Sequence, residues 1–221
     1  MKDSKILTNN FYLIKNDFKK LIDPIWEKYI SFSNIEKRND YLHNHYNCND
    51  MNILKEFIKN KVDRNFLNLS NDKIKELFNL ANNKIEYFDI LNNSPNFVAG
   101  FFILPKDSII PIHNHPNRFD IAKHIYGNVL IKNYNVIKNE QNEKGLIKIQ
   151  ENDDIYFQDS EISILTPFSS NIHEVRALEN SIVFDIILPA YDEAKGEDND
   201  YFQIIETYEN KNKKEIYIKK I

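Results

Sequence analysis

The sequence predicts a mainly β fold, a jelly-roll barrel that follows an α-helical N-terminal region. Two observations support this prediction. In the first part of the chain, apolar residues recur at three- and four-residue steps, which is typical of amphipathic helices. After Pro95, short runs rich in Val, Ile, Phe and Tyr are separated by Pro, Gly, Asn or Asp, which is typical of an antiparallel structure with many strands.

A chain of 221 residues fits one large domain or two small ones. We expect residues 1–92 to form a helical region packed on the barrel, and residues 93–221 to form the barrel itself. Together the two parts are expected to make one structural unit.

The helical region contains three predicted helices. In order, they lie around residues 11–22, with Pro24 opening or kinking the stretch that follows, over residues 53–62, and from an N-cap at Ser70 to Leu80.

About nine strands are predicted after Pro95, enough for a sandwich or a jelly-roll barrel of the cupin kind. They cover Val98–Leu104, Ile109–His113, Ala122–Ile137 with a turn at Gly127-Asn128, Leu146–Gln150, Ile162–Leu165, Ile172–Ala177, Ile182–Leu188, Phe202–Thr207 and Ile216–Ile218.

Composition and charge exclude several classes of protein. The net charge of -4 with mixed signs offers no basic surface for nucleic acid as the main partner. No apolar run approaches the roughly 18 residues that span a bilayer, so no membrane contact is expected. The single cysteine, Cys48, excludes internal disulfides and fits a reducing compartment. These features favour the cytoplasm, with the nucleus as an alternative. A monomer is expected.

Two histidines one residue apart, His113 and His115, follow a predicted strand. Residues i and i+2 of a strand face the same side, so both imidazoles would share one space, and His173 on another predicted strand could join them. This pattern fits a metal site, because neutral imidazole is a common ligand of iron, zinc, copper and nickel. The alternative is a set of hydrogen-bonded barrel histidines. A second pair, His43 and His45, lies in the polar helical region and is expected to lie at the surface without a functional role.

One carboxylate stands in an otherwise apolar predicted strand, Ile182–Leu188. A buried acid must be paired or hydrogen-bonded, so Asp185 is expected to support something polar.

Four separated motifs follow one another along the chain: Pro111-Ile-His113-Asn-His115-Pro116 with Lys123, Tyr126-Gly127 and Lys132-Asn-Tyr134; Pro167-x-x-x-Asn171-Ile172-His173-Glu174; Asp185 with Pro189-Ala-Tyr191; and Gly196-Glu-Asp198-x-x-Tyr201-Phe202. Through these motifs, in the same order, the chain resembles the cysteine oxidase and cysteamine (2-aminoethanethiol) dioxygenase family over about residues 98–205.

The resemblance implies a cupin barrel that holds one Fe(2+) through His113, His115 and His173 and adds both atoms of O2 to a thiol, giving a sulfinic acid. It further implies that Asp185 orients a ligand histidine or the substrate amine, and that Tyr191 donates a hydrogen bond into the site. The simpler interpretations are a structural buried acid for Asp185 and ordinary packing for Tyr191.

The chain departs from the family pattern at several positions. Asn117-Arg118 replaces Gly-Met, which puts a cation near the expected mouth of the site, and Ser170 replaces the usual glycine before Asn171. Asn199 replaces a cysteine that many members have, so a thioether crosslink from that cysteine to a tyrosine is absent here. His124, which could face the outer surface of the sheet, and Cys48 receive no role.

Two functional hypotheses follow. The first is a thiol dioxygenase that acts on the N-terminal cysteine of a peptide or protein, or on cysteamine, and in the former case serves as an oxygen sensor through N-degron formation. The second is a non-catalytic or other-metal cupin that binds a small ligand, because this fold hosts many functions. Free cysteine as substrate would need a carboxylate clamp, for which Arg118 is the candidate.

Overall fold

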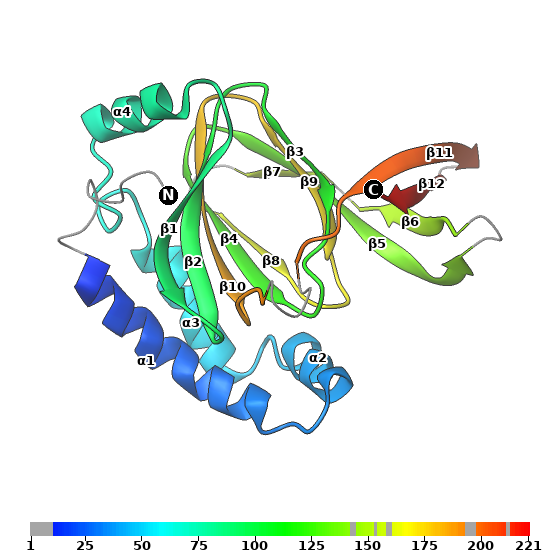
Figure 1. Cartoon of the computed structure of the whole chain (residues 1–221), viewed down its shortest axis with the longest axis horizontal. Helices are drawn as coiled ribbons and strands as arrows, with labels where there is room; N and C mark the ends of the chain where they lie inside the picture. The colour runs from blue at the N-terminus through cyan, green and yellow to red at the C-terminus, as the bar shows by residue number, and fades with distance from the viewer. Residues whose placement is uncertain (1–10, 142–144, 153, 158–160, 193–197, 211–212) are drawn as a thin grey trace.

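The computed structural model describes residues 11–141, 145–152, 154–157, 161–192, 198–210 and 213–221 (Figure 1). This part of the chain contains helices α1 (Phe11–Ile30), α2 (Ile35–Asn44), α3 (Asn49–Lys61) and α4 (Asn71–Ala81). The strands are β1 (Glu86–Asn93), β2 (Phe97–Leu104), β3 (Ile109–His113), β4 (Phe119–Tyr126), β5 (Val129–Gln141), β6 (Ile147–Glu151), β7 (Ile155–Phe157), β8 (Ile162–Leu165), β9 (Ile172–Ala177), β10 (Ser181–Leu188), β11 (Phe202–Asn210) and β12 (Lys213–Lys220).

The strands form two antiparallel sheets that face each other. The five-stranded sheet has the order β1-β2-β10-β4-β8, and the seven-stranded sheet has the order β11-β12-β6-β5-β9-β3, with β7 paired to β5. Figure 1 shows the two sheets curling around a common interior, while β11, β12 and β6 project to one side. Several neighbours are distant in sequence, such as β2 with β10 and β5 with β9, as in a jelly roll. The predicted barrel with N-terminal helices is confirmed.

The expected helical region extends too far. Residues 86–93 form strand β1, which pairs with β2 from Glu86↔Ile103 to Asn93↔Phe97. A strand pattern predicts apolar residues at alternate positions that face the barrel. In β1 two of these positions hold Tyr87 and Asp89, which line the cavity, so the alternation is not visible in the sequence. The prediction of helix up to residue 92 is therefore wrong beyond Ala81.

Three smaller differences separate the predicted elements from the observed ones. Pro24 lies inside one continuous helix, α1, rather than starting a new one. Helix α2 was not predicted, and β7 is a three-residue strand, too short to be detected by pattern. The turn between β4 and β5 lies where it was expected, and Gly127 adopts the left-handed conformation with φ 83°.

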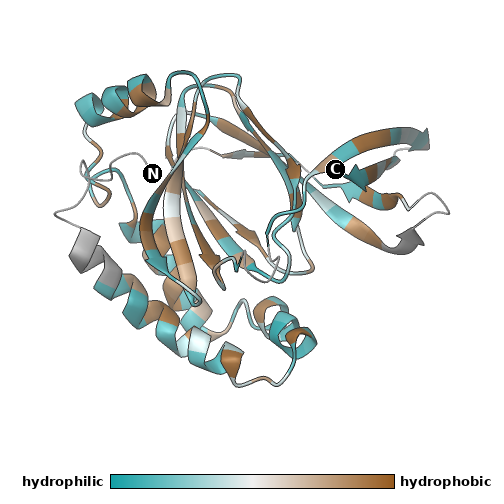
Figure 2. Cartoon of the chain, viewed as in Figure 1, coloured by the Kyte–Doolittle hydropathy of each residue, from teal (hydrophilic) through white to brown (hydrophobic). Residues whose placement is uncertain are grey.

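The helices cover the outer face of the five-stranded sheet (Figure 1). Phe18 of α1 stacks on Phe184 of β10, with ring centroids 5.8 Å apart, and both side chains are fully buried. Hydrophobic and hydrophilic segments alternate along α1 (Figure 2), as expected for a helix that buries one face. One continuous core thus joins α1–α4 to this sheet.

A lysine also joins the helices to the barrel. Lys123 on β4 is 2% exposed, and its ammonium group donates hydrogen bonds to the carbonyl oxygens of Ile58, at 3.0 Å, and of Lys59. These carbonyls belong to the last turn of α3, where a cation is favoured, and the Ile58 carbonyl also accepts from the Val62 backbone N–H. Lys123 therefore caps α3 from the barrel side.

Among the described residues, no helix combines the length and apolar character required to cross a membrane.

Candidate metal centre

Three histidines meet inside the barrel. His113 at the end of β3 is directly opposite His173 on β9, and His115 follows two residues after His113. The ring centroids are 4.2 Å apart for His113 and His173, 5.0 Å for His113 and His115, and 5.1 Å for His115 and His173. One ring nitrogen of each lies within 4.8 Å of the others, and all three residues are buried. The structure therefore brings together the three residues that the sequence singled out.

Burial keeps these imidazoles neutral. Desolvation lowers the pKa of His113, against a smaller opposite effect of its hydrogen bond to Pro111. The pKa values of His115 and His173 lie well below the usual value, first because of burial and then because of neighbouring positive charge, including that of His113. A neutral imidazole keeps a lone pair, which is the form that binds a metal.

Hydrogen bonds determine which nitrogen carries the lone pair in two of the rings. Nδ1 of His113 lies 2.8 Å from the Pro111 carbonyl oxygen, which can only accept, so Nδ1 carries the proton and Nε2 is free. Nδ1 of His115 contacts the hydroxyl of Tyr191, which itself donates to Oδ1 of Asn199. His115 Nδ1 therefore donates to Tyr191, and its Nε2 is free. Such partners fix the orientation of ligand histidines.

Asn171 holds the two ligand segments together. Its Oδ1 accepts a hydrogen bond from the backbone N–H of His115 at 3.0 Å, and its Nδ2 donates to the carbonyl oxygens of His115, at 2.9 Å, and Thr166, at 3.1 Å. Ser170 just before it has φ 54°, so the turn keeps the left-handed conformation without a glycine. Asn171 thus fixes His115 relative to His173, two residues further along the chain.

Asp185 lies on the opposite side of the interior, in the five-stranded sheet. It is 4% exposed and pairs across the sheet with Gly100 on one side and Ala122 on the other. Burial raises the pKa of Asp185 to about 7, against a smaller lowering by a hydrogen bond from Tyr87. The expectation of a buried carboxylate with a polar partner is confirmed at this position.

Tyr87 reaches Asp185 by crossing Gly100. A Cβ on Gly100 would lie 2.5 Å from the Tyr87 hydroxyl oxygen, closer than real contacts allow. The missing side chain therefore leaves the space that Tyr87 occupies on its way from β1 to Asp185. Sequence reasoning missed Tyr87 because β1 itself was not predicted.

Asp120 is a second buried carboxylate of the five-stranded sheet, and it too was missed. It is 4% exposed, and its Oδ2 lies 3.8 Å from Nε2 of His115. Burial, and then the charge of Asp185, raise the pKa of Asp120. Its position between Phe119 and Ile121 is the same signal that identified Asp185, a carboxylate between apolar strand residues.

These groups line one cavity of about 390 Å³. The histidines come from the seven-stranded sheet and its loops, and the two buried acids come from the five-stranded sheet. Tyr191 borders the same space, and most of the remaining lining is apolar. The arrangement can therefore hold a metal ion on one side and a polar ligand group on the other.

Arg118 does not lie at the mouth. Its side chain is fully buried, where it donates to the carbonyl oxygens of Pro116 and Ala190 and lies over the Tyr191 ring, 4.4 Å from the centroid. The expectation of a mouth cation is wrong because backbone carbonyls and an aromatic face satisfy the guanidinium inside the protein.

The remaining singled-out residues lie outside the cavity. His124 does not face the outer surface of the sheet, because its ring contacts Phe157 at 6.3 Å and its Nε2 hydrogen-bonds to the Gly127 carbonyl. His45 is exposed, whereas His43 is half-buried and hydrogen-bonds to Thr166 at 2.7 Å. Cys48 is a half-buried free thiol at the start of α3. Gly196 of the fourth motif lies outside the described residues.

The residues present fit a metal ion. Among the described residues, His113, His115 and His173 are the one group of side chains placed to bind one. Their neutral rings, and the free Nε2 atoms of His113 and His115, supply ligands on one side of a cavity that leaves room for a further molecule.

Two curled antiparallel sheets that enclose a histidine triad able to hold a metal ion define a barrel of the cupin class. The model of the PCO_ADO family matches residues 42–219 of this chain. The chain therefore belongs to the PCO_ADO family.

Proteins of known function give a consistent result. The chain is 28% identical to human 2-aminoethanethiol dioxygenase over 132 residues, which cover 50% of this chain and 49% of that protein. It is 29% identical to plant cysteine oxidase 1 of Arabidopsis thaliana over 116 residues, or 51% of this chain and 39% of that protein. The chain thus aligns with about half, or less, of the length of these relatives.

Solved structures are similar to parts of the chain. The cupin domain of Cnp3 from Schizosaccharomyces pombe has a TM-score of 0.37 and 10% identity, covering 51% of this chain and 68% of that one. KdgF from Halomonas sp. has a TM-score of 0.38 and 15% identity, covering 50% of this chain and 83% of that one.

Proposed function

We propose that this chain is an iron(II)-dependent thiol dioxygenase that acts on the N-terminal cysteine of a peptide or protein, or on cysteamine. The observation that carries the proposal is the triad of neutral, buried imidazoles at a cavity that also contains a buried carboxyl, in a member of the PCO_ADO family. The relatives named for cysteamine and cysteine oxidation support the same chemistry.

The net reaction is R–SH + O2 → R–SO2H, in which the thiol sulfur is oxidised and both oxygen atoms are retained. Bound iron would supply a site that lowers the pKa of the thiol and provides electrons to O2. Three neutral ligands leave the full charge of the metal available to an anionic sulfur, which favours histidines over carboxylates on this side of the cavity.

The protein's own groups then hold and orient the substrate. We propose His113, His115 and His173 as the metal ligands. Asp185, on the opposite side of the cavity, would accept a hydrogen bond from the substrate amine, and its bond from Tyr87 fixes one carboxyl oxygen. Tyr191 accepts from His115 Nδ1 and so orients that ring, a role that its hydrogen bond to Asn199 supports. The apolar lining limits the access of water.

The biological role that we propose is oxygen sensing in the cytoplasm. Oxidation of an N-terminal cysteine would mark the protein that carries it for degradation when O2 is plentiful. The predicted reducing compartment fits a free thiol substrate. We propose that the enzyme acts as a monomer.

The test is a direct assay for oxygen incorporation. Iron-loaded protein is mixed anaerobically with an N-terminal-cysteine peptide, cysteamine or free cysteine, then exposed to O2 and analysed by mass spectrometry. We expect a gain of two oxygen atoms on one of the first two thiols, and its loss in a His173→Ala variant. Iron bound stoichiometrically without any gain would contradict the proposal and favour a ligand-binding cupin.

A further inference from the structure

Two carboxylate oxygens inside the cavity have no hydrogen-bond donor. Oδ1 of Asp120 and Oδ1 of Asp185 are both buried and without a partner among the described residues. Buried polar atoms are almost always paired, and an unpaired buried charge is strongly unfavourable. A pair of such atoms that line one cavity therefore indicates that something outside the chain completes them.

The two carboxylates point into the same space. Asp120 on β4 is opposite Ile187 on β10, and Asp185 is two residues away on the same strand. Residues i and i+2 share a face of a strand, so Asp120 and Asp185 are diagonal neighbours on the inner face of the five-stranded sheet. Both line the cavity that the histidines enter from the opposite sheet.

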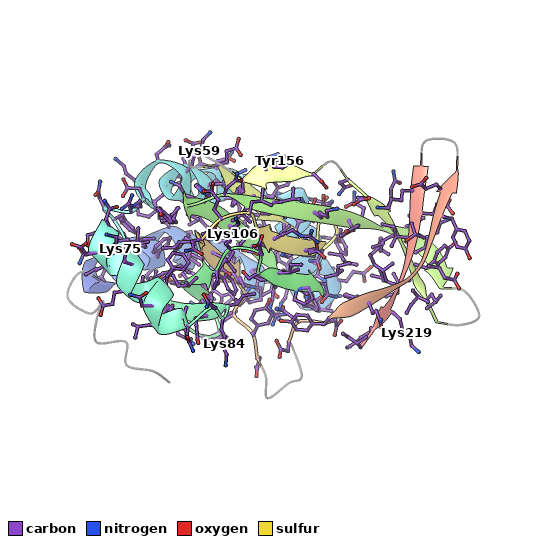
Figure 3. The ribbon with its side chains drawn as sticks, turned by 90° about the horizontal axis from the view of Figure 1, so that it is seen from above. Lys59, Lys75, Lys84, Lys106, Tyr156 and Lys219 are labelled. Atoms are coloured by element: carbon purple, nitrogen blue, oxygen red, sulfur yellow. The ribbon has the colours of Figure 1, made fainter. Side chains whose placement is uncertain are left out.

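Among the described residues, no lysine or arginine is placed to neutralise them. Neither lysine nor arginine occurs among the described residues that line the cavity. Arg118, near in sequence, is occupied by the carbonyls of Pro116 and Ala190 and by the face of Tyr191. The exposed lysines labelled in Figure 3, such as Lys59, Lys75 and Lys219, lie along the outside of the molecule. Among the described residues these oxygens thus have no cationic partner, and a cation that enters with a ligand would complete them.

We infer that Asp120 is a specificity residue that, together with Asp185, binds the ammonium group of an aminothiol substrate. This inference rests on the proposed function, because it places the thiol beside the three histidines. The Asp120 carboxylate lies 3.8 Å from His115 Nε2, so it borders the histidine group and is placed to meet the amine of a short aminothiol bound there. The distance exceeds that of a hydrogen bond, so the carboxylate is not occupied by the imidazole.

The same pair disfavours a substrate carboxylate. Free cysteine carries both an ammonium and a carboxylate, and the carboxylate would enter a cavity lined by Asp120, Asp185 and the exposed Asp89. Arg118, the candidate clamp for that group, is not among the residues lining the cavity. Cysteamine and an N-terminal cysteine in a peptide present the amine without the adjacent negative charge. Asp120 therefore selects for the amine and against the free acid.

The test measures binding without turnover. Anaerobic calorimetry on the iron-loaded protein compares cysteamine with 2-mercaptoethanol, which has a hydroxyl in place of the amine, and with free cysteine. We expect the parent to bind cysteamine about 10- to 100-fold more tightly than 2-mercaptoethanol, the range for a hydrogen bond to a charged group. Asp120→Asn should lose most of this preference and bind free cysteine relatively better, with unchanged iron content and unchanged affinity for 2-mercaptoethanol.

The controls separate this inference from its alternatives. Asp107→Asn changes the same charge at an exposed site and should leave the preference intact. If Asp120→Asn does not fold, as judged by circular dichroism, Asp120→Ser replaces it in the same titrations. Three results would overturn the inference. The variant could keep the preference of the parent, or it could lose iron, which would make Asp120 a metal ligand. The third is that the parent binds neither thiol.

Exposure of the same samples to O2 distinguishes the two proposals. Preferential amine binding that depends on Asp120, but with no sulfinic acid formed, would refute the dioxygenase and leave amine recognition standing. Formation of sulfinic acid together with a preference that does not depend on Asp120 would support the dioxygenase and refute the role of Asp120.

Discussion

The two sides of the cavity respond to burial in opposite ways. On the histidine side, contributed by β3, β9 and the segment after β3, desolvation lowers the pKa values of His113, His115 and His173. On the acid side, contributed by β4 and β10, desolvation raises the pKa values of Asp120 and Asp185. Burial thus neutralises both sets of groups.

The difference lies in what neutrality does to each group. A neutral imidazole is ready to bind a metal ion, so burial alone prepares the histidine side. A neutral carboxyl is a poor partner for a cation, so the acid side reaches its binding form only when a positive charge arrives. The predictions below test this asymmetry, from the largest expected effect to the smallest.

Removing one histidine should destroy the metal side and leave the acid side in place. We expect His173→Ala to lower the affinity for Fe(2+) more than about 100-fold, because even groups that only orient ligands contribute 10- to 100-fold. Metal content after dialysis against a weak chelator measures the loss. Asp185→Asn is the matched control and should bind iron like the parent; equal loss of iron in both variants would contradict the division into two sides.

Filling the space above Gly100 should disturb the acid side alone. In Gly100→Ala the new Cβ would collide with Tyr87 and with the Phe88 carbonyl oxygen, both 2.5 Å away. We expect the free energy of unfolding to fall by about 1–3 kcal/mol, the usual range for overpacking, with iron affinity nearly unchanged. Denaturant unfolding measures this. The same substitution in a Tyr87→Ala background should cost less; an equal cost would show that Tyr87 is not the obstacle.

The histidines and the buried acids should make the free energy of unfolding depend on pH in opposite directions. The pKa of Asp185 is raised from 3.8 to about 7, so between these values the unfolded chain loses a proton that the folded protein keeps. Its contribution to stability is therefore full below pH 3.8 and lost as the pH rises through 7. The histidines, whose pKa values are lowered, instead lose stability as the pH falls below about 6.5.

Asp185→Asn isolates the acid part of this pH dependence. Relative to the parent, we expect the metal-free variant to gain at least about 3 °C in melting temperature between pH 5 and pH 8, because each pKa unit corresponds to about 1.4 kcal/mol. Thermal melts at several pH values measure the gain. A constant difference between variant and parent would mean that Asp185 is ionised in the folded protein throughout.

A turn on the histidine side should tolerate change with little effect. Ser170 has φ 54°, a conformation that costs a non-glycine residue about 1 kcal/mol, while glycine makes the unfolded chain more flexible. These effects oppose each other, so we expect Ser170→Gly to change the free energy of unfolding by less than about 1 kcal/mol and to leave iron affinity unchanged. Chemical denaturation tests this, and a large gain would show that the serine strains the site.

The histidine side was predictable from the sequence and the acid side only in part. His113 and His115 follow from strand alternation, and His173 from the need for another strand. Asp185 was identified because it interrupts an apolar run. Asp120 has the same kind of neighbours, but the predicted strand began at Ala122, three residues after the true start of β4, and so left Asp120 outside it.

The misplaced residues share one physical cause. Sequence patterns assume that charged and polar side chains face solvent, and a polar cavity reverses that assumption. Arg118 was expected at the mouth but is buried against backbone carbonyls. Residues 86–92 were assigned to the helical region, because Tyr87 and Asp89, which line the cavity, hide the alternation of β1. Only the tertiary arrangement reveals that these positions are internal.

Lys123 has a consequence for how this protein could change over time. One ammonium group on β4 donates to two carbonyl oxygens in the last turn of α3. A recombination event that exchanged the helices for those of another barrel would leave a buried charge without these acceptors, and loss of the lysine would remove a donor from both carbonyls. We therefore expect the C-terminal end of α3 and strand β4 to be inherited together. The melting temperature of a Lys123→Met variant would measure how much this contact contributes to stability.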